Sequence, residues 1–248
     1  GKSHFFERIG STAAQKRASR HSDTPRMDTP HSRRKVSLED YDWADLIDQE
    51  DKVRLLISPQ SEYAMAGAWA MGRAMDDAII SAATGTAYSG VAGGTSVSLP
   101  SGQKVAHASG GLTLAKLLSA KEILDAADVD PDEPRFLVCA AGQIADLLNV
   151  SQVTSADYNT VRALAAGQID TYLGFKFIQS ERLGTDSTPS RQCLAFTKSA
   201  IGLAVGADVT TKISERADKN YATQVFLSMT IGATRIEEEK MVEIAANE

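Results

Sequence analysis

The residue types that most often carry chemistry are sparse and scattered in this sequence. Cys139 and Cys193 each lie inside an apolar stretch (RFLVCAA and RQCLAFT), which predicts reduced core thiols rather than a disulfide framework. The four histidines have no spacing that suits a metal ion: His4, His21, His31 and His107. We therefore expect neither a metal site nor a bound cofactor.

Carboxylates gather at three places, but none of them predicts catalysis. Asp76 and Asp77 are adjacent, so on a helix they point about 100° apart and cannot flank one substrate atom. The acidic stretch at 128–134 (DVDPDEP) contains Pro131 and lacks the glycine and distal glutamate of an EF-hand, which favours a solvated turn. Residues 237–239 form an acidic run typical of a wet strand end. No nucleophile elbow, zinc-protease motif, dinucleotide fingerprint or Cys-x-x-Cys is present, so we expect no enzyme.

Charge is distributed unevenly along the 248 residues, whose formal net charge is −6. Residues 1–35 carry nine Lys or Arg against three acids, a charge of +6, and the remainder carries 17 bases against 29 acids, a charge of −12. The basic end could bind nucleic acid or the acidic body of a neighbouring copy. The overall acidity of the chain argues against nucleic acid. The basic run at 31–35 has no interleaved aromatics to stack on bases, which favours a simple basic strand start over a nucleic-acid patch.

The hydrophobic content of 43% is too high for a wholly disordered chain. No apolar run reaches about 18 residues, and the amino end (GKSHFFERIG) has no hydrophobic signal core. We therefore expect a soluble intracellular product that makes no membrane contact.

One long helix, expected over residues 59–83, would position the rest of the chain. Ser58 can cap its first turn, Pro59 suits the first helical position, and Gly85 allows the turn that ends it. Its length would be roughly 37 Å at 1.5 Å per residue. Met65, Trp69, Gly72, Met75, Ile79 and Ala83 form one stripe, whereas alanines and Gly67 keep the remaining surface thin. A thin helix lets a sheet approach closely.

Several segments alternate as strands do. Residues 1–50 predict a long hairpin that has too little apolar surface to form a core of its own. Residues 135–140 predict a buried strand, which a helix over 142–150 and a second helix over 158–166 would follow. Residues 171–183 alternate as one further strand. The clearest strand signal lies at 225–232, and alternation resumes at 241–245. These last strands need the long helix as support, which predicts one domain built from both ends of the chain with the middle inserted.

Nearly the whole chain resembles one family of proteins. The resemblance lies in FFERIG, in the stretch from SRHSDTPRMDTPHSRRKVSLEDYDWADLID to the long helix DKVRLLISPQSEYAMAGAWAMGRAMDDAIISAATGTAY, and in GLTLAKLLSAKEILDAADVD. It continues through TSADYNTVRALAAGQIDTYLGFKFIQSERL and the carboxyl end, RQCLAFTKSAIGLAVGADVTTKISERADKNYATQVFLSMTIGATRIEEEKMVEIA. The family is that of the major capsid proteins of tailed bacteriophages, whose fold is shared with herpesvirus shells.

The resemblance implies an α+β capsid fold in three parts. Residues 1–50 would form an extended hairpin loop. Residues 51–136 and 208–248 would form a peripheral domain with a spine helix and a β-sheet, and residues 137–207 an axial α/β domain around the capsomer axis.

The resemblance also gives the uneven charge a role as contacts between subunits. The basic hairpin would lie on the acidic surface of an adjacent copy. The candidate contact residues are Arg26, Arg33, Arg34 and Lys35 on the hairpin, with Asp76, Asp77, Glu237, Glu238 and Glu239 as their partners.

The implied function is a structural one. The chain would assemble with itself as hexamers and pentamers of an icosahedral head, in the host cytoplasm, with scaffold, portal and cement proteins as further partners. The head would enclose double-stranded DNA without sequence-specific binding, because an acidic wall repels DNA. The alternatives are a nanocompartment shell protein of the same fold and a small α/β enzyme, which a deep pocket of convergent polar groups would favour.

Overall fold

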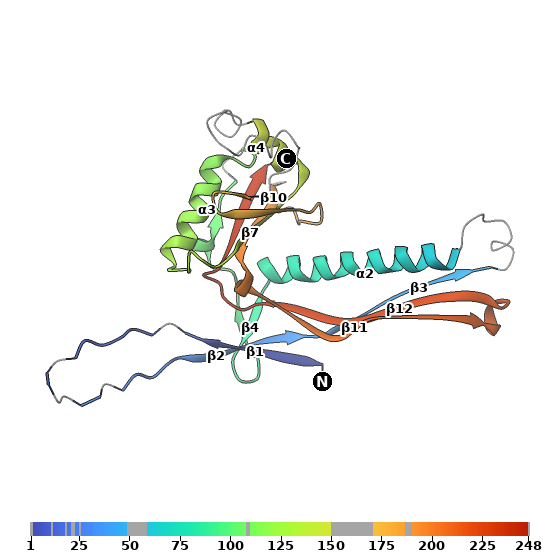
Figure 1. Cartoon of the computed structure of the whole chain (residues 1–248), viewed down its shortest axis with the longest axis horizontal. Helices are drawn as coiled ribbons and strands as arrows, with labels where there is room; N and C mark the ends of the chain where they lie inside the picture. Colours follow the sequence, from blue (N-terminus) through green and yellow to red (C-terminus); the bar gives the residue numbers. More distant parts are fainter. Residues whose placement is uncertain are drawn as a thin grey trace.

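The computed structural model describes residues 2–10, 12–17, 19–20, 23–24, 26–48, 59–107, 110–149, 171–186 and 190–247. A long helix lies along a ribbon of long strands, and a rounded body of sheet and helices sits at one end of that helix (Figure 1). A hairpin projects in the direction opposite to the ribbon. The expected α+β class is confirmed. No helix in the described ranges has the length and apolarity needed to cross a membrane.

The helix expected over 59–83 is present as α2 (Pro59–Thr84). It ends where the N–H of Gly85 donates to the carbonyl of Ser81 at 2.9 Å. Its thin side faces the ribbon: a Cβ added at Gly67 would lie only 2.7 Å from Leu227 Cδ1 and from Trp43 Cε3. The backbone of α2 therefore approaches the sheet as closely as the absence of a side chain allows.

The ribbon is a three-stranded antiparallel sheet in the order β11-β12-β3. Its strands are β3 (Glu39–Ile47), β11 (Ile201–Arg216) and β12 (Ala222–Arg235). Val225, Leu227, Met229 and Ile231 of β12 are each at most 1% exposed and pack beneath α2. The strong alternation in this segment thus comes from one face of the strand being covered by the helix.

The projecting hairpin belongs to a four-stranded sheet in the order β1-β2-β4-β5. Its strands are β1 (Ser3–Ile9), β2 (His31–Ser37), β4 (Ala87–Ser89) and β5 (Thr95–Val97). Strands β1 and β2 pair antiparallel from Ser3↔Ser37 to Ile9↔His31. We call residues 10–30, which join these two strands, the connector. The short strands β4 and β5 lie in the glycine-rich segment after α2 and support the base of the hairpin.

The rounded body contains a six-stranded sheet in the order β6-β13-β10-β7-β9-β8. Its strands are β6 (Lys104–Val105), β7 (Arg135–Cys139), β8 (Thr171–Tyr172), β9 (Phe175–Gln179), β10 (Ser190–Thr197) and β13 (Met241–Asn247). Helices α3 (Leu114–Ala126) and α4 (Ala141–Asn149) belong to the same body. Its core joins residues of α3, β7, β10 and β13 with Ala83 at the end of α2.

Strand β13 and helix α3 have neighbours outside the domain in which each was expected. Strand β12 packs on α2, as expected for 208–248, but β13 pairs with β10 from Ser190↔Asn247 to Phe196↔Met241. Helix α3, expected with the long helix in 51–136, contributes Leu117 and Leu124 to the core of the rounded body. Strand β13 and helix α3 thus lie with the segment expected as the axial domain.

The structure describes the residues of one of two further expected elements, the strand over 171–183, but not those of the helix over 158–166. Residues 171–183 do not form one strand: Leu173 (φ 52°) and Gly174 (φ 85°) make a turn between β8 and β9. Alternation could not reveal this, because a two-residue turn leaves apolar residues alternating on both sides of it. The helix expected over 158–166 lies outside the described residues.

Candidate subunit-interface surfaces

Arg34 and Glu238 form a buried ion pair where the hairpin joins the rest of the molecule. Arg34 lies on β2, and its Nη2 donates to both carboxylate oxygens of Glu238 at 2.7 Å. Its Nε donates to the carbonyl of Ile236 at 3.1 Å. The two residues are only 3% and 7% exposed. They were predicted as contacts between copies, but they bind each other within one chain and attach β2 to the β12–β13 connection.

Arg235, which belongs to no sequence motif, completes this buried junction. Its Nη1 donates to the carbonyls of Ala83 and Gly85, both at 2.8 Å, and its Nη2 donates to Val97 at 3.0 Å. The guanidinium therefore satisfies carbonyls at the carboxyl end of α2, where a positive charge is favoured. Burial lowers the pKa of Arg235, and the Glu238 carboxylate counteracts part of this shift. The only signal in the sequence is the spacing of Arg235 three residues before Glu238.

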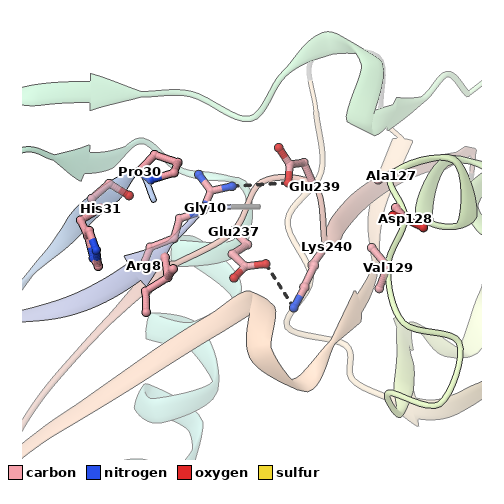
Figure 2. Close-up of a pocket in the computed structure, with 12 residues that line it drawn as sticks. Arg8, Gly10, Pro30, His31, Ala127, Asp128, Val129, Glu237, Glu239 and Lys240 are labelled. Carbon is pink, nitrogen blue, oxygen red and sulfur yellow. Dashed lines mark hydrogen bonds and ion pairs between the residues drawn. The ribbon is translucent and has the colours of Figure 1, made fainter. Parts of the chain in front are cut away.

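A cleft of about 580 Å³ lies between the hairpin base and the body (Figure 2). Arg8 Nη2 contacts Glu239 at 3.4 Å on one side, and Lys240 contacts Glu237 at 3.1 Å. Asp128, after α3, lies on the far wall. The charges that line this cleft are thus largely paired within the chain. The Arg8–Glu239 pair holds the hairpin base against the body, whereas Lys240 and Glu237 pair locally within the β12–β13 connection.

The other predicted hairpin residues lie on or near β2. Arg33 Nη2 contacts Glu7 Oε1 at 3.0 Å across the β1–β2 pair. Lys35 is half-buried and its aliphatic chain packs against Gly93, where an added Cβ would lie 2.4 Å from Lys35 Cδ. Arg26 is exposed in the connector. Among the described residues, neither Lys35 nor Arg26 has a salt-bridge partner.

Asp76 and Asp77 have different surroundings despite being adjacent. Arg182, which follows β9, donates two hydrogen bonds to the Asp77 carboxylate, and this contact raises the pKa of Arg182. Asp76 is exposed and lines a mostly apolar groove of about 400 Å³ with Ile79, Phe136 and other residues of the body. Asp77 therefore ties α2 to the rounded body, and Asp76 stays available to a partner.

No residue that the structure describes covers the amino-terminal part of the upper face of α2, opposite the sheet, and we call this part the bare face. Met65 is 48% exposed and Trp69 is 64% exposed, and no atom lies within 4 Å of a Cβ added at Gly72. The same face becomes covered near the carboxyl end, where Ile80 and Ala83 pack against the core of the body. Two large apolar side chains on one exposed helix face are typical of a protein interaction surface.

The described residues provide little for catalysis or metal binding. They contain no group of three or more metal-ligating side chains. Burial raises the pKa of the Cys139 and Cys193 thiols to about 12 each, so both stay protonated and unreactive at neutral pH.

Comparison with known proteins identifies the architecture. A family model described as phage capsid protein matches residues 1–248. The capsid of Ralstonia phage GP4 superposes with a TM-score of 0.75 at 10% identity, covering 100% of this chain and 84% of that one. The capsid of cyanophage P-SCSP1u gives 0.74 at 19% identity, covering 100% and 84%, and that of cyanophage Pam1 gives 0.73 at 14%, covering 100% and 85%.

The structural matches establish the fold, and the family model extends over every residue of the chain. No curated protein is similar enough in sequence to count as a relative. The chain belongs to the phage capsid protein family.

Proposed function

We propose that this major capsid protein builds its shell through contacts in which the hairpin of one copy reaches the next copy. The observation that carries the proposal is the projection of the β1–β2 hairpin away from the rest of the molecule (Figure 1). An isolated two-stranded hairpin is marginally stable in water, so its far end gains from a second surface.

The exposed surfaces of the body support the same proposal. The bare face of α2 offers Met65 and Trp69 to a neighbouring copy. Of the predicted contact residues, Arg26, Lys35 and Asp76 carry charges without a salt bridge to any described residue. Arg34 and Glu238 take a different role in this proposal: they fix the direction in which the hairpin leaves the body.

In the proposed assembly, copies form hexamers and pentamers of an icosahedral head in the host cytoplasm, and scaffold, portal and cement proteins complete it. Residues 36–248 carry a net charge of −12, so the wall would repel rather than adsorb packaged DNA. The phage capsid family favours this role over a nanocompartment shell, and membership of a structural family favours a non-enzymatic protein.

Light scattering combined with negative-stain microscopy tests the proposal. The chain, expressed alone and together with a scaffold protein, is expected to form capsomer rings or closed shells of megadalton mass. A monodisperse 26.5 kDa monomer in both cases, across salt and protein concentration, would contradict it.

A further inference from the structure

Strand β3 has an open edge. It is the last strand in the order β11-β12-β3, and it pairs with β12 over nine positions, from Thr223↔Ile47 to Ile231↔Glu39. On its outer side no other strand of the described chain pairs with it. Such an edge presents unpaired N–H and C=O groups that can bind an extended segment of another chain.

This open edge is acidic throughout. Strand β3 carries Glu39, Asp40, Asp42 and Asp45, all exposed, and it contains no Lys or Arg. None of the four forms a salt bridge with another residue that the structure describes. Because facing residues of paired strands share a face, Glu39 and Asp45 lie on the α2 side and Asp40 and Asp42 on the other. Like charges repel a second β3, so the edge selects a basic partner.

The connector of the hairpin has the complementary character. It carries Lys16, Arg17, Arg20 and Arg26 against Asp23 and Asp28. All six side chains are exposed, and the described connector residues belong to no strand, so their backbone groups are not used in a sheet. The connector can therefore supply both positive charge and spare backbone hydrogen bonds.

The connector and the β3 edge of one molecule lie far apart. The connector extends to the left of the body, whereas β3 runs to the right beneath α2 (Figure 1). The two surfaces are complementary in charge but lie at opposite ends of the molecule. The connector therefore cannot bind the β3 edge of its own chain. A contact between two different patches on identical copies is head to tail, and it closes into a ring when the rotation permits.

From these observations we infer that the outer edge of β3 is the docking strand for the basic connector of a second copy. This inference rests on the proposed shell function and adds the surface that receives the hairpin. Salt weakens the contact, because exposed charges are screened over about 10 Å at 0.1 M ionic strength.

Charge reversal on each side, followed by their combination, tests the inference. The first variant carries Asp42→Lys with Asp45→Lys, the second carries Arg17→Glu with Arg20→Glu, and the third carries all four changes. Each of the first two is expected to lower the assembled fraction roughly tenfold at about 0.1 M salt. The variant with all four changes is expected to regain most of the assembled fraction, because the two surfaces again carry opposite charges, with the signs exchanged. Light scattering and negative-stain microscopy measure the assembled fraction.

A matched control uses the opposite edge of the same sheet. Asp208→Lys with Glu215→Lys makes the same charge change on β11, and assembly is expected to stay unchanged. Asp45 and Asp208 are locally equivalent, since each accepts a hydrogen bond at 2.8 Å from the N–H of the next residue. If circular dichroism shows that the lysine variant is misfolded, the milder variant Asp42→Asn with Asp45→Asn replaces it. Its assembled fraction is expected to lie between those of the unaltered chain and the charge-reversed variants.

Two results would overturn the inference. One is normal assembly of the folded β3 variants, and the other is a four-residue variant that assembles no better than its parents. Either leaves the shell function intact, because the unaltered chain still assembles in the same experiment. Failure of the unaltered chain to assemble, alone and with a scaffold protein, contradicts the shell function and the inference together.

Discussion

At the scale of single residues, Glu238 is the centre of a cationic cluster. Arg34 binds both of its oxygens at 2.7 Å, Arg8 Nη1 lies 3.6 Å away, and Arg235 Nε lies 3.8 Å away. A buried charge is tolerated only when partners replace its hydration. One carboxylate thus links β1, β2 and β12, which explains why a hairpin without its own core leaves the body in a defined direction.

Replacement of Glu238 by Gln is expected to destabilise the chain strongly. The change leaves the buried guanidiniums of Arg34 and Arg235 without their carboxylate, which costs about 3 kcal/mol of unfolding free energy. Denaturant unfolding measures this loss. The matched control is Glu239→Gln, whose exposed pair with Arg8 contributes at most about 1 kcal/mol. Equal losses for both variants would show that Glu238 is not a buried anchor.

Glu133 is expected to contribute to the loss of folding stability at low pH. Partial burial raises its pKa, but hydrogen bonds from Ser199 and the charge of Lys240 outweigh burial, so the pKa of Glu133 lies below the usual 4.5. A carboxyl with a lowered pKa stabilises the fold above its unfolded pKa, and this contribution is lost as the pH falls through the folded pKa.

Glu133→Gln should therefore reduce stability at neutral pH and flatten its decline below about pH 4.5. Unfolding free energies of the variant and the unaltered chain, measured between about pH 6 and about pH 3, test this expectation. The difference between the two proteins should shrink toward the acid end. A constant difference over the whole range would exclude the proposed linkage.

At the scale of elements, α2 uses opposite faces for two partners. The face with Gly67 and Met71 packs on the three-stranded sheet, and the face with Ile80 and Ala83 enters the core of the body. The stripe of Met65, Trp69 and Ala83 predicted from the sequence is therefore buried only at its carboxyl end. The helix extends beyond the rounded body, and no other described element covers its amino-terminal part (Figure 1).

Two glycines of α2 allow a matched test of this packing. Gly67→Ala places a methyl group 2.7 Å from Leu227 Cδ1, and the overpacking is expected to cost about 1–3 kcal/mol of unfolding free energy. Gly72→Ala meets open space and is expected to stabilise the chain by about 0.5–1 kcal/mol through helix propensity. Thermal or denaturant unfolding measures both changes in unfolding free energy, which are expected to have opposite signs. Stabilisation by both variants would contradict the close contact at Gly67.

At the scale of the whole molecule, the shape favours contact with other copies over self-contained packing. The hairpin and the three-stranded ribbon extend in opposite directions from the rounded body (Figure 1). The connector of the hairpin, the outer edge of β3 and the bare face of α2 all present surface that no described element covers. Extended elements of this kind gain stability when neighbouring copies cover them.

Trp69→Ser tests the bare face of α2 at this scale. Because Trp69 is 64% exposed, the unfolding free energy of the unassembled chain is expected to change by less than about 0.5 kcal/mol. The assembled fraction should fall, because an aromatic anchor of the contact is lost. Unfolding of the monomer and light scattering of the assembly separate the two effects. Normal shells from this variant would remove α2 from the contact surface.

The sequence by itself determined the features that depend on neighbouring residues along the chain. The helix at Pro59–Thr84 follows from Pro59 at its first position, its apolar and alanine content and Gly85 after its end. The cap expected at Ser58 lies outside the described residues. The strand signal at 225–232 follows from strict alternation. Likeness along nearly the whole chain was enough to predict a phage capsid protein.

Only the tertiary structure decided which surfaces meet. Arg34 and Glu238 are 204 residues apart, and β13 pairs with β10 rather than staying with β12 against α2. Periodicity shows that a helix or strand has an apolar face, but the partner of that face depends on contacts between distant residues. The same reason applies to the nine predicted contact residues. Their charge was readable from the sequence, whereas the pairing of six of them within one chain was not: Arg33, Arg34, Asp77, Glu237, Glu238 and Glu239.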